Sequence, residues 1–489
     1  MALLSQAEHA RAVGEVRAAF GALDPSRPVR LAKRTSNLFR ARAATSAAGL
    51  DVSKLDAVVE VDPASRTAQV QGMATYERVV DETLEFGLMP LVVPQLKTIT
   101  LGGAVTGLGI ESSSFRNGLP HESVLSMDIL TGTGEVVTAT PTGEHADLYR
   151  AFPNSYGSLG YAMSLTVELE PVANFVRLRH LRFFDVAGLL DAVAHVMDSR
   201  QWHGVAVDFV DGVVFARDEC YLVLGTWADS LAPSESPSDY TGQHVYYRSI
   251  QHRARDVLTV RDYLWRWDTD WFWCSRAFGA QNPWIRRMWP KRWLRSDIYW
   301  KLVGIEQRYH PMARLDAMRG RPQQERVIQD VELPLDATGD FLDWFLREVP
   351  VEPIWLCPVQ LRGLPTASGP VPGLGATANP SRTAAGRPSE LGDETPWSLY
   401  PMHVGVPYVN VGFWSTVPVA PGAVTGDVNR EIERVVGSLG GHKSLYSDAY
   451  YDREDFLAQY GGTAYQRVKG RYDPVGRFPD LYDKAVRRQ

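Results

Sequence analysis

Cysteine is scarce in this chain of 489 residues, and no two cysteines form a CxxC pair. The three that occur, Cys220, Cys274 and Cys357, are far apart in the sequence. A disulfide framework needs more cysteines, and a cysteine-rich zinc site needs closely spaced pairs. We therefore expect reduced thiols and no metal site.

The sequence also lacks a run of about eighteen apolar residues, the length that a membrane-spanning helix needs. Its first residues carry charges throughout and lack the basic start and apolar core of a signal peptide. The net charge of −6 disfavours nucleic acid as a partner. Lysine is rare, with 8 residues against 43 arginines, a skew typical of GC-rich bacterial genomes. We expect a cytoplasmic bacterial protein, with peripheral association at the inner face of the cell membrane left open.

The spacing of apolar residues predicts an α+β protein with several packed units. Short strands and helices alternate in the first part, and a second set of strands and helices begins after residue 172. Within that second set, residues 363–397 are rich in Pro, Gly, Ala, Ser and Thr and are expected to form a mobile loop. The expected parts are an N-terminal helix (1–27), a first unit (28–172), a second unit (173–430) and a C-terminal segment (431–489).

Glycines and small hydroxyl residues are densest at 101–118, LGGAVTGLGIESSSFRNG. Glycine lets backbone N–H groups approach a ligand, and Ser and Thr add short donors, so the stretch predicts a loop that cradles a phosphorylated cofactor. It lies between an extended segment, 90–100, and a strand pair predicted at 123–140. A Rossmann loop would run from a strand directly into a helix with another glycine spacing. A flexible surface loop is the alternative interpretation.

This stretch and its flanks resemble the FAD-binding domain of the vanillyl-alcohol-oxidase (PCMH) type. Residues 100–103, 107–114, Gly118 and 146–160 carry the resemblance. It implies that FAD lies between two α+β subdomains, that a separate α+β cap covers its ring system, and that the C-terminal segment returns to the flavin. The FAD-binding residues that it implies are Lys33, Thr35, Ser36, Asn37, Thr100, Gly102, Gly103, Gly107, Gly109, Ile110, Ser112, Ser113, Ser114, Gly118, Gly157, Ser158 and Gly160.

Some of these assignments have alternatives. Residues 32–40 lack the glycine-rich form of the first cofactor loop in the wider family, and residues 157–160 also suit a plain helix-to-strand turn. Glu111 suits either hydrogen bonding to backbone amides or a role near the flavin.

Covalent attachment of a flavin needs a histidine or cysteine near these loops. No histidine lies between His9 and His121, and no cysteine precedes Cys220. We therefore expect noncovalent FAD, with His121 as the one position able to overturn this.

A narrower resemblance, to 24-dehydrocholesterol reductase and its bacterial relatives, rests on GIESSS at 109–114, PIWLCP at 353–358 and LYSDAYYDREDF at 445–456. It implies reduction of an isolated C=C bond in a lipid with FAD and NADPH or NADH. The substrate would be a methylene-branched fatty acyl chain or a sterol side chain, and the bacterial composition favours the acyl chain. The alternatives are an FAD-dependent alcohol oxidase of the same fold and a flavin-less lipid-binding protein.

The catalytic residues that this resemblance suggests lie in the C-terminal segment. An unactivated alkene accepts a hydride poorly, so a positioned acid must protonate one of its carbons. We expect Tyr446 or Tyr450 to donate this proton and Asp448 to orient it, with Arg453 nearby. A solvated polar loop is the alternative.

Tryptophan is concentrated at residues 261–301, which hold eight of the fourteen in the chain. Six Arg or Lys residues and no acidic residue lie between Cys274 and Ser296. Tryptophan suits the membrane interface and cations suit anionic headgroups, so the segment predicts a peripheral membrane contact. An aromatic core with snorkelling arginines is the alternative.

Overall fold

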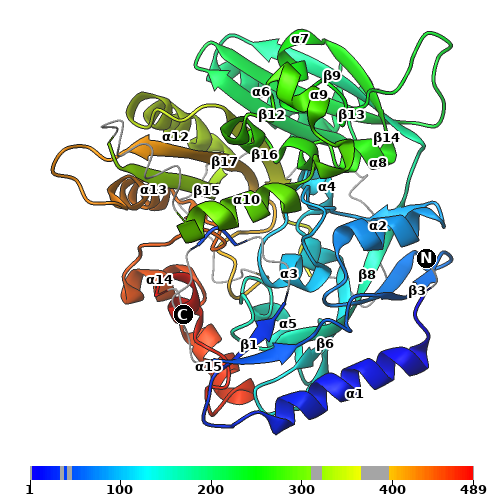
Figure 1. Cartoon of the computed structure of the whole chain (residues 1–489), viewed down its shortest axis with the longest axis vertical. Coiled ribbons are helices and arrows are strands. Elements are labelled where there is room, and N and C mark those ends of the chain that lie inside the picture. Colours follow the sequence, from blue (N-terminus) through cyan, green and yellow to red (C-terminus); the bar gives the residue numbers. More distant parts are fainter. Residues whose placement is uncertain (1–2, 34–37, 41–46, 310–321, 365–395, 488–489) are drawn as a thin grey trace.

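The computed structural model describes residues 3–33, 38–40, 47–309, 322–364 and 396–487. These residues form two large antiparallel sheets that share one hydrophobic core and are surrounded by helices (Figure 1). The mixture of helix and strand expected from the sequence is confirmed. Among these residues, no helix has the length and apolar character needed to cross a bilayer.

The first sheet has six strands in the order β3-β4-β8-β6-β7, with β5 paired to β8. A turn at Asp62–Ser65 joins β3 to β4, and the strand pair predicted at 123–140 is confirmed as β6 and β7. A separate parallel pair, β1 and β2, lies at the edge of this unit. The bounds are α1 Gln6–Ala22, β1 Val29–Ala32, β2 Ala48–Asp51, β3 Val58–Asp62, β4 Thr67–Gln71, α2 Tyr76–Leu84, β5 Leu88–Pro90, β6 Val124–Leu130, β7 Val136–Ala139, α5 Ala146–Ala151 and β8 Tyr161–Pro171.

The second sheet begins directly after β8 and has eight strands in the order β14-β9-β13-β12-β16-β17-β15-β18. Apolar residues of α6, α12 and α13 cover one of its faces. The bounds are β9 Phe175–Phe183, α6 Val186–Ser199, β10 Gln201–Trp202, β11 Val205–Ala206, β12 Phe209–Ala216, β13 Glu219–Ala228, α7 Tyr246–His252, β14 Arg255–Thr259, α8 Val260–Leu264, α9 Pro283–Met288, α10 Ser296–Tyr309, β15 Gln324–Pro334, α12 Leu335–Glu348, β16 Ile354–Gln360, β17 Pro407–Pro418, α13 Asp427–Ser438 and β18 His442–Lys443.

The opposite face of this sheet turns toward the first unit, and strand alternation decides which side chains reach it. On β16, Ile354 and Leu356 pack under the covering helices, whereas Trp355 and Cys357 belong to the core shared with the first unit. Because successive side chains of a strand point to opposite faces, β15 likewise presents Asp330 on the side away from the apolar Val331.

The sequence predicts a loop over the glycine-rich stretch at 101–118. The structure shows that this stretch is not a loop throughout. It contains two short helices, α3 Leu101–Thr106 and α4 Ser114–Asn117, joined by residues 107–113. The Thr100 hydroxyl caps α3 by accepting a hydrogen bond of 3.2 Å from the Gly103 amide. The small residues therefore allow tight packing of helices as well as an open loop.

The C-terminal helices pack on the first unit, beside β1 and α5 in Figure 1. Their bounds are α14 Arg453–Gln459, α15 Gly462–Tyr472 and α16 Leu481–Ala485. The phenol of Tyr472 on α15 donates to Asp147 on α5 at 2.8 Å. Most of the loop expected at 363–397 lies outside the described residues.

Candidate functional site

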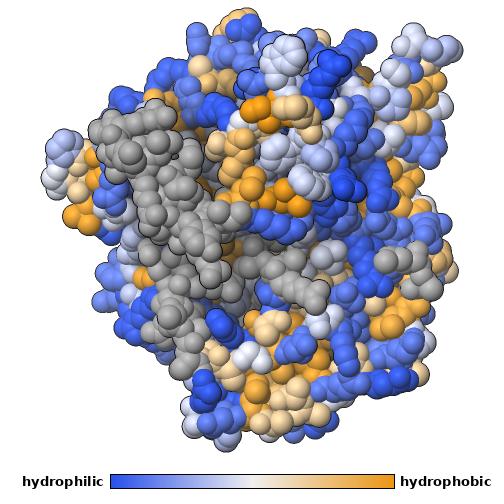
Figure 2. All heavy atoms as spheres, viewed as in Figure 1, coloured by the Kyte–Doolittle hydropathy of each residue, from blue (hydrophilic) through white to orange (hydrophobic). Residues whose placement is uncertain are grey.

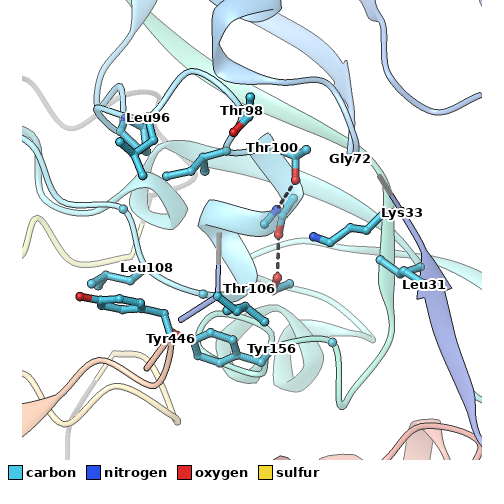
Figure 3. A pocket seen from close by; sticks show the side chains of 18 of the residues that line it. Leu31, Lys33, Gly72, Leu96, Thr98, Thr100, Thr106, Leu108, Tyr156 and Tyr446 are labelled. Carbon is cyan, nitrogen blue, oxygen red and sulfur yellow. Dashed lines mark hydrogen bonds between the residues drawn. The ribbon is translucent and has the colours of Figure 1, made fainter. Parts of the chain in front are cut away.

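A cavity of about 310 Å³ lies between the two units, within the size range of small-molecule sites. Its walls come from segments that are far apart in the sequence. The first unit supplies β1, the turn before β8 and residues 94–110, and the second unit supplies β15, β16 and β17. Figure 3 shows α3 in the centre of this site, with Lys33 extending toward it and Tyr446 reaching it from the C-terminal segment.

One wall of the cavity is made of backbone and small residues. Residues 107–110 line it, and within the described part of the chain no group accepts a hydrogen bond from the amides of Leu108, Gly109 or Ile110. The turn before β8 adds Gly157 and Gly160 to the residues that line the cavity, and both have positive φ. This wall offers backbone donors at close range to a ligand.

The charges that line the cavity are mainly positive, although the whole chain is acidic. Among the described residues, four cations and a single carboxyl line it, and the carboxyl is Asp330. The four cations are Arg30, Lys33, Arg40 and Lys484. Such a wall suits a ligand with several negative charges, such as a pyrophosphate.

The far end of the cavity is aromatic and contains a buried acid. Phe272, Trp355 and Trp414 line it together with Asp330 and Tyr446. The indole N–H of Trp414 donates to the Tyr446 phenol oxygen at 2.8 Å, and the Tyr446 phenol also interacts with the Asp330 carboxyl. Burial raises the pKa of Asp330 to about 7, although the interaction with Tyr446 lowers it, and burial holds the pKa of Tyr446 well above its usual value.

The backbone around Asp330 makes room for its carboxyl group. Gly412 lies opposite Asp330 in the register of β15 and β17, and a Cβ at Gly412 would overlap the Asp330 carboxyl oxygen. The Asn410 side-chain amide donates to that oxygen at 3.3 Å. The carboxyl is therefore held in place by its neighbours on the sheet.

Residues 8–140 match the model of the family described as "FAD binding domain". Over 440 residues the chain is 25% identical to "Delta(24)-sterol reductase" of Homo sapiens, an alignment that covers 88% of this chain and 76% of the relative. It is 26% identical over 461 residues to the Arabidopsis thaliana "Delta(24)-sterol reductase", covering 89% and 76%. The "Cytokinin dehydrogenase 9" of Oryza sativa subsp. japonica is 26% identical over 157 residues, which cover 32% of this chain and 29% of that protein. The chain is an FAD-dependent oxidoreductase.

The cavity fits FAD on three observations from the structure. The glycine wall presents backbone amides, the four cations match a pyrophosphate, and the aromatic end can cover a flat ring system. Of the FAD-binding residues predicted from the sequence, those that line the cavity are Lys33, Thr100, Gly102, Gly103, Gly107, Gly109, Ile110, Gly157 and Gly160.

The other predicted FAD-binding residues lie elsewhere. Residues 35–37, predicted as Thr35, Ser36 and Asn37, fall outside the described residues. The serines at 112–114 are buried behind the cavity wall and hold the loop: the Ser112 hydroxyl donates to Glu111 at 2.6 Å, and that of Ser113 donates to the Leu91 carbonyl at 2.9 Å. Ser158 and Gly118 are likewise not among the lining residues, and Gly118 ends α4 with a positive φ of 68°.

Three of the four catalytic residues predicted in the C-terminal segment do not line the cavity. Asp448 lies 3.6 Å from the Arg326 guanidinium, and Arg453 lies 3.9 Å from Asp480. The Tyr450 ring lies under the Arg430 guanidinium at 5.1 Å. Of the four, the structure brings only Tyr446 to the cavity.

Asp330 was missed in the sequence because it looks like part of an ordinary strand. Apart from Ile328 and Gln329, the run RVIQDVELP alternates polar and apolar residues, a pattern typical of a strand with one solvated face. Here the polar face turns into the protein, where Asp330 and Glu332 are both buried. Its partner Tyr446 lies on another segment, so no local motif links the two.

His121 and Glu111 also lie behind the cavity. The His121 ring packs against Trp397 and Tyr400, with centroids 4.6 and 5.0 Å away, and is not a lining residue. Glu111 accepts hydrogen bonds from the Ser112 amide and from Arg266, at 2.8 and 3.0 Å. Of its two suggested roles, the structure shows the contact with a backbone amide.

Gly109 provides a test of the glycine wall. A Cβ at this position would lie 2.7 Å from Pro120 Cγ and 2.8 Å from Pro94 Cγ, and both rings are rigid. Gly109→Ala should therefore displace residues 107–110 and weaken FAD retention about tenfold. A tenfold change corresponds to about 1.4 kcal/mol, which lies within the free-energy cost of about 1–3 kcal/mol for overpacking a tightly packed site. The ratio of flavin to protein absorbance after gel filtration measures this.

Gly14→Ala is the matched control, because a Cβ on Gly14 in α1 would meet nothing within 4 Å. This variant should keep the FAD content of the wild type. An equal FAD content in the Gly109→Ala variant would contradict the assignment of this wall to the cofactor.

Proposed function

We propose that this chain reduces an isolated C=C bond of a lipid, with electrons from NADPH or NADH passed through FAD. One of the two carbons of this double bond carries two alkyl groups. The relatives named Delta(24)-sterol reductase support this reaction class. The observation that carries the proposal is the buried Asp330–Tyr446 pair at the aromatic end of an otherwise cationic, glycine-lined cavity. Methylene-branched acyl chains and sterol side chains both have the required bond.

The residues that would hold FAD follow from the two ends of the cavity. The amides of 107–110 and the cations Lys33, Arg40 and Lys484 would bind its pyrophosphate, and the aromatic end would bind its ring system. In this arrangement the first unit is the two-part FAD-binding domain, the second unit is the cap, and the C-terminal segment returns to the flavin through Tyr446. When bound, FAD would supply the hydride for one carbon of the double bond.

The other carbon must receive a proton, and Tyr446 is placed to give it. A tyrosine phenol is protonated at neutral pH, and burial raises the pKa of Tyr446 further, so the donor carries its proton. The Tyr446 O–H transfers its proton to the less substituted carbon, and Asp330, which interacts with the Tyr446 phenol, replaces that proton. In this scheme Asp330 takes the part that the sequence-based prediction gave to Asp448.

The proposal is tested with purified, FAD-loaded protein under anaerobic conditions. NADPH and NADH are each used to bleach the flavin, and a methylene-branched phospholipid or a sterol with a side-chain double bond is then added. Return of the flavin absorbance, with a product two mass units heavier, is the expected result. If an alcohol reduces the flavin, oxygen reoxidises it with formation of peroxide, and neither alkene reoxidises it, the proposal is contradicted and an alcohol oxidase is favoured.

Asp330 gives the reaction a defined pH dependence. The protonated carboxyl is the active form, so product formation should fall as the pH rises through about 7, the pKa of Asp330 in the folded protein. Asp330→Asn should be slower at every pH, by about tenfold to a hundredfold, and should lose this decline because the amide does not ionise. The initial rate measured between pH 5 and 9 checks both statements.

Stability provides a second measurement of the same group. Burial raises the pKa of Asp330 above its value in the unfolded chain. The protonated carboxyl therefore contributes to the stability of the fold at pH values below the unfolded pKa, and this contribution is lost as the pH rises to about 7. Asp330→Asn should therefore be more stable than the wild type above pH 7 but not near pH 4. Asp448→Asn, which alters a carboxyl outside the cavity, is the matched control and should change neither profile. A decline near pH 7 that persists in Asp330→Asn would contradict the role of Asp330.

A further inference from the structure

The tryptophan-rich segment at 261–301 divides into a buried and an exposed half. Trp265, Trp267, Trp271 and Trp273 are buried in the core shared by the two units. The later part is exposed: of the ten large hydrophobic side chains that are exposed within the described residues, four lie within positions 284–293. The aromatic-core interpretation therefore fits the first half of the segment and also Trp289 and Trp300, which pack against that core, but not the exposed side chains within 284–293.

The exposed half is built around α9, which has its polar anchor inside and its apolar residues outside. Arg286 is buried and pairs with Asp270, with nitrogen-to-oxygen distances of 2.6 and 3.0 Å. Its guanidinium also donates to the carbonyls of Gly242, Tyr240 and His244. Because these five bonds fix one side of α9 against the protein, the opposite side must face outward.

The outward side is unusually apolar for a surface. Trp284 is 78% exposed, Met288 79%, Trp293 46% and Ile285 37%. Soluble proteins seldom expose large apolar residues in one group unless the group binds something. Figure 2 shows hydrophobic and hydrophilic atoms side by side over the part of the molecule that carries α9 and α10.

The charges around these residues identify the partner. Arg287, Lys291 and Arg292 are exposed beside them, and no acidic residue occurs from Trp271 to Ser296. Lys291 also pairs with Asp239 at 3.0 Å, but both side chains of that pair remain mostly exposed. Tryptophan at the headgroup level and a one-sign basic rim are the chemistry of an anionic bilayer surface.

We propose that this part of the protein rests on an anionic phospholipid bilayer. The contact, called the α9 surface, consists of Trp284, Ile285, Met288, Arg287, Lys291 and Arg292, with Trp293 at its edge. The apolar side chains enter the headgroup region and the cations contact lipid phosphates. The inference does not depend on which reaction the cavity performs.

Vesicle sedimentation of the FAD-loaded protein tests the proposal. The vesicles are phosphatidylcholine alone or phosphatidylcholine mixed with phosphatidylglycerol. The wild type should sediment with the mixed vesicles, and added salt should weaken the binding. Trp284→Ala/Met288→Ala should bind the mixed vesicles about tenfold more weakly. Arg287→Gln/Arg292→Gln should lose about tenfold or more on mixed vesicles and change little on neutral ones.

Phe184→Ala is the matched control, because Phe184 is a single exposed apolar residue, 70% exposed, outside the α9 surface. It should bind as the wild type does. Flavin content and melting temperature confirm that each variant is folded. Failure of the wild type to bind mixed vesicles, or wild-type binding by the Trp284→Ala/Met288→Ala variant, would overturn the proposal. So would a dimer in gel filtration that this variant dissociates, because the surface would then belong to a second copy of the chain.

Discussion

Tyr446→Phe is expected to lower lipid reduction by about 10²- to 10⁴-fold, the range that a positioned general acid contributes. The substitution removes only the phenol oxygen, which lies at the cavity wall, accepts from the Trp414 indole at 2.8 Å and interacts with the Asp330 carboxyl. The ring stays to pack against Phe39, whose centroid is 5.7 Å away. FAD content and flavin reduction by NADPH or NADH should therefore stay near those of the wild type.

The measurement separates the two half-reactions. Stopped-flow absorbance first follows bleaching of the flavin by the nicotinamide, and then its recovery when the lipid is added. Only the second step should slow. Tyr450→Phe is the matched comparison, because Tyr450 lies under Arg430 and is not a cavity residue. Equal losses in the two variants would contradict the assignment to Tyr446, and so would a slowed flavin reduction.

Local patterns predicted the elements of the fold well. The strand pair predicted at 123–140 is present as β6 and β7, so turn residues and alternation suffice to locate it. The stretch at 101–118 was located as well, but its helices were not, because α3 and α4 have only six and four residues and too few turns to show a helical period.

The site was harder to predict because it is assembled from distant segments. The glycines that line the cavity share a dense local motif, whereas Asp330 and Tyr446 meet only when β15 and the segment after β18 come together. Alternation on β15 gives two faces but does not say which face is buried. The polar residues on the inner face, Asp330 and Glu332, make that strand resemble one with a solvated side.

A second set of buried charges joins the loop at 107–113 to the second unit. Arg266 is fully buried and contacts Glu111 at 3.0 Å and Asp211 at 2.9 Å. Asp211 also accepts from the indoles of Trp267 and Trp355, at 3.2 and 3.3 Å. Glu111 directly follows the cavity residue Ile110, so this network links the cavity wall at 107–110 to strand β12 and to the aromatic end.

Arg266→Leu is expected to destabilise the protein by about 3–5 kcal/mol. It leaves the carboxylates of Glu111 and Asp211 buried without the cation between them, and an uncompensated buried charge costs far more than the lost attraction. The loop at 107–110 should loosen at the same time, so FAD should dissociate at a lower temperature. Thermal unfolding followed by circular dichroism and by flavin fluorescence measures both effects.

Arg217→Leu is the matched control, because Arg217 pairs with Asp343 at 3.0 Å while both side chains are more than half exposed. Solvent screens such a pair, so its loss should cost only about 0–1 kcal/mol. Adding Glu111→Gln and Asp211→Asn to Arg266→Leu removes both unpaired charges and should restore part of the stability, because the penalty comes from charge and not from the shape of the side chain. A triple variant no more stable than Arg266→Leu alone would instead assign the loss to packing of the Arg266 side chain between Tyr246 and Tyr263, whose rings lie 5.6 and 4.0 Å from its guanidinium.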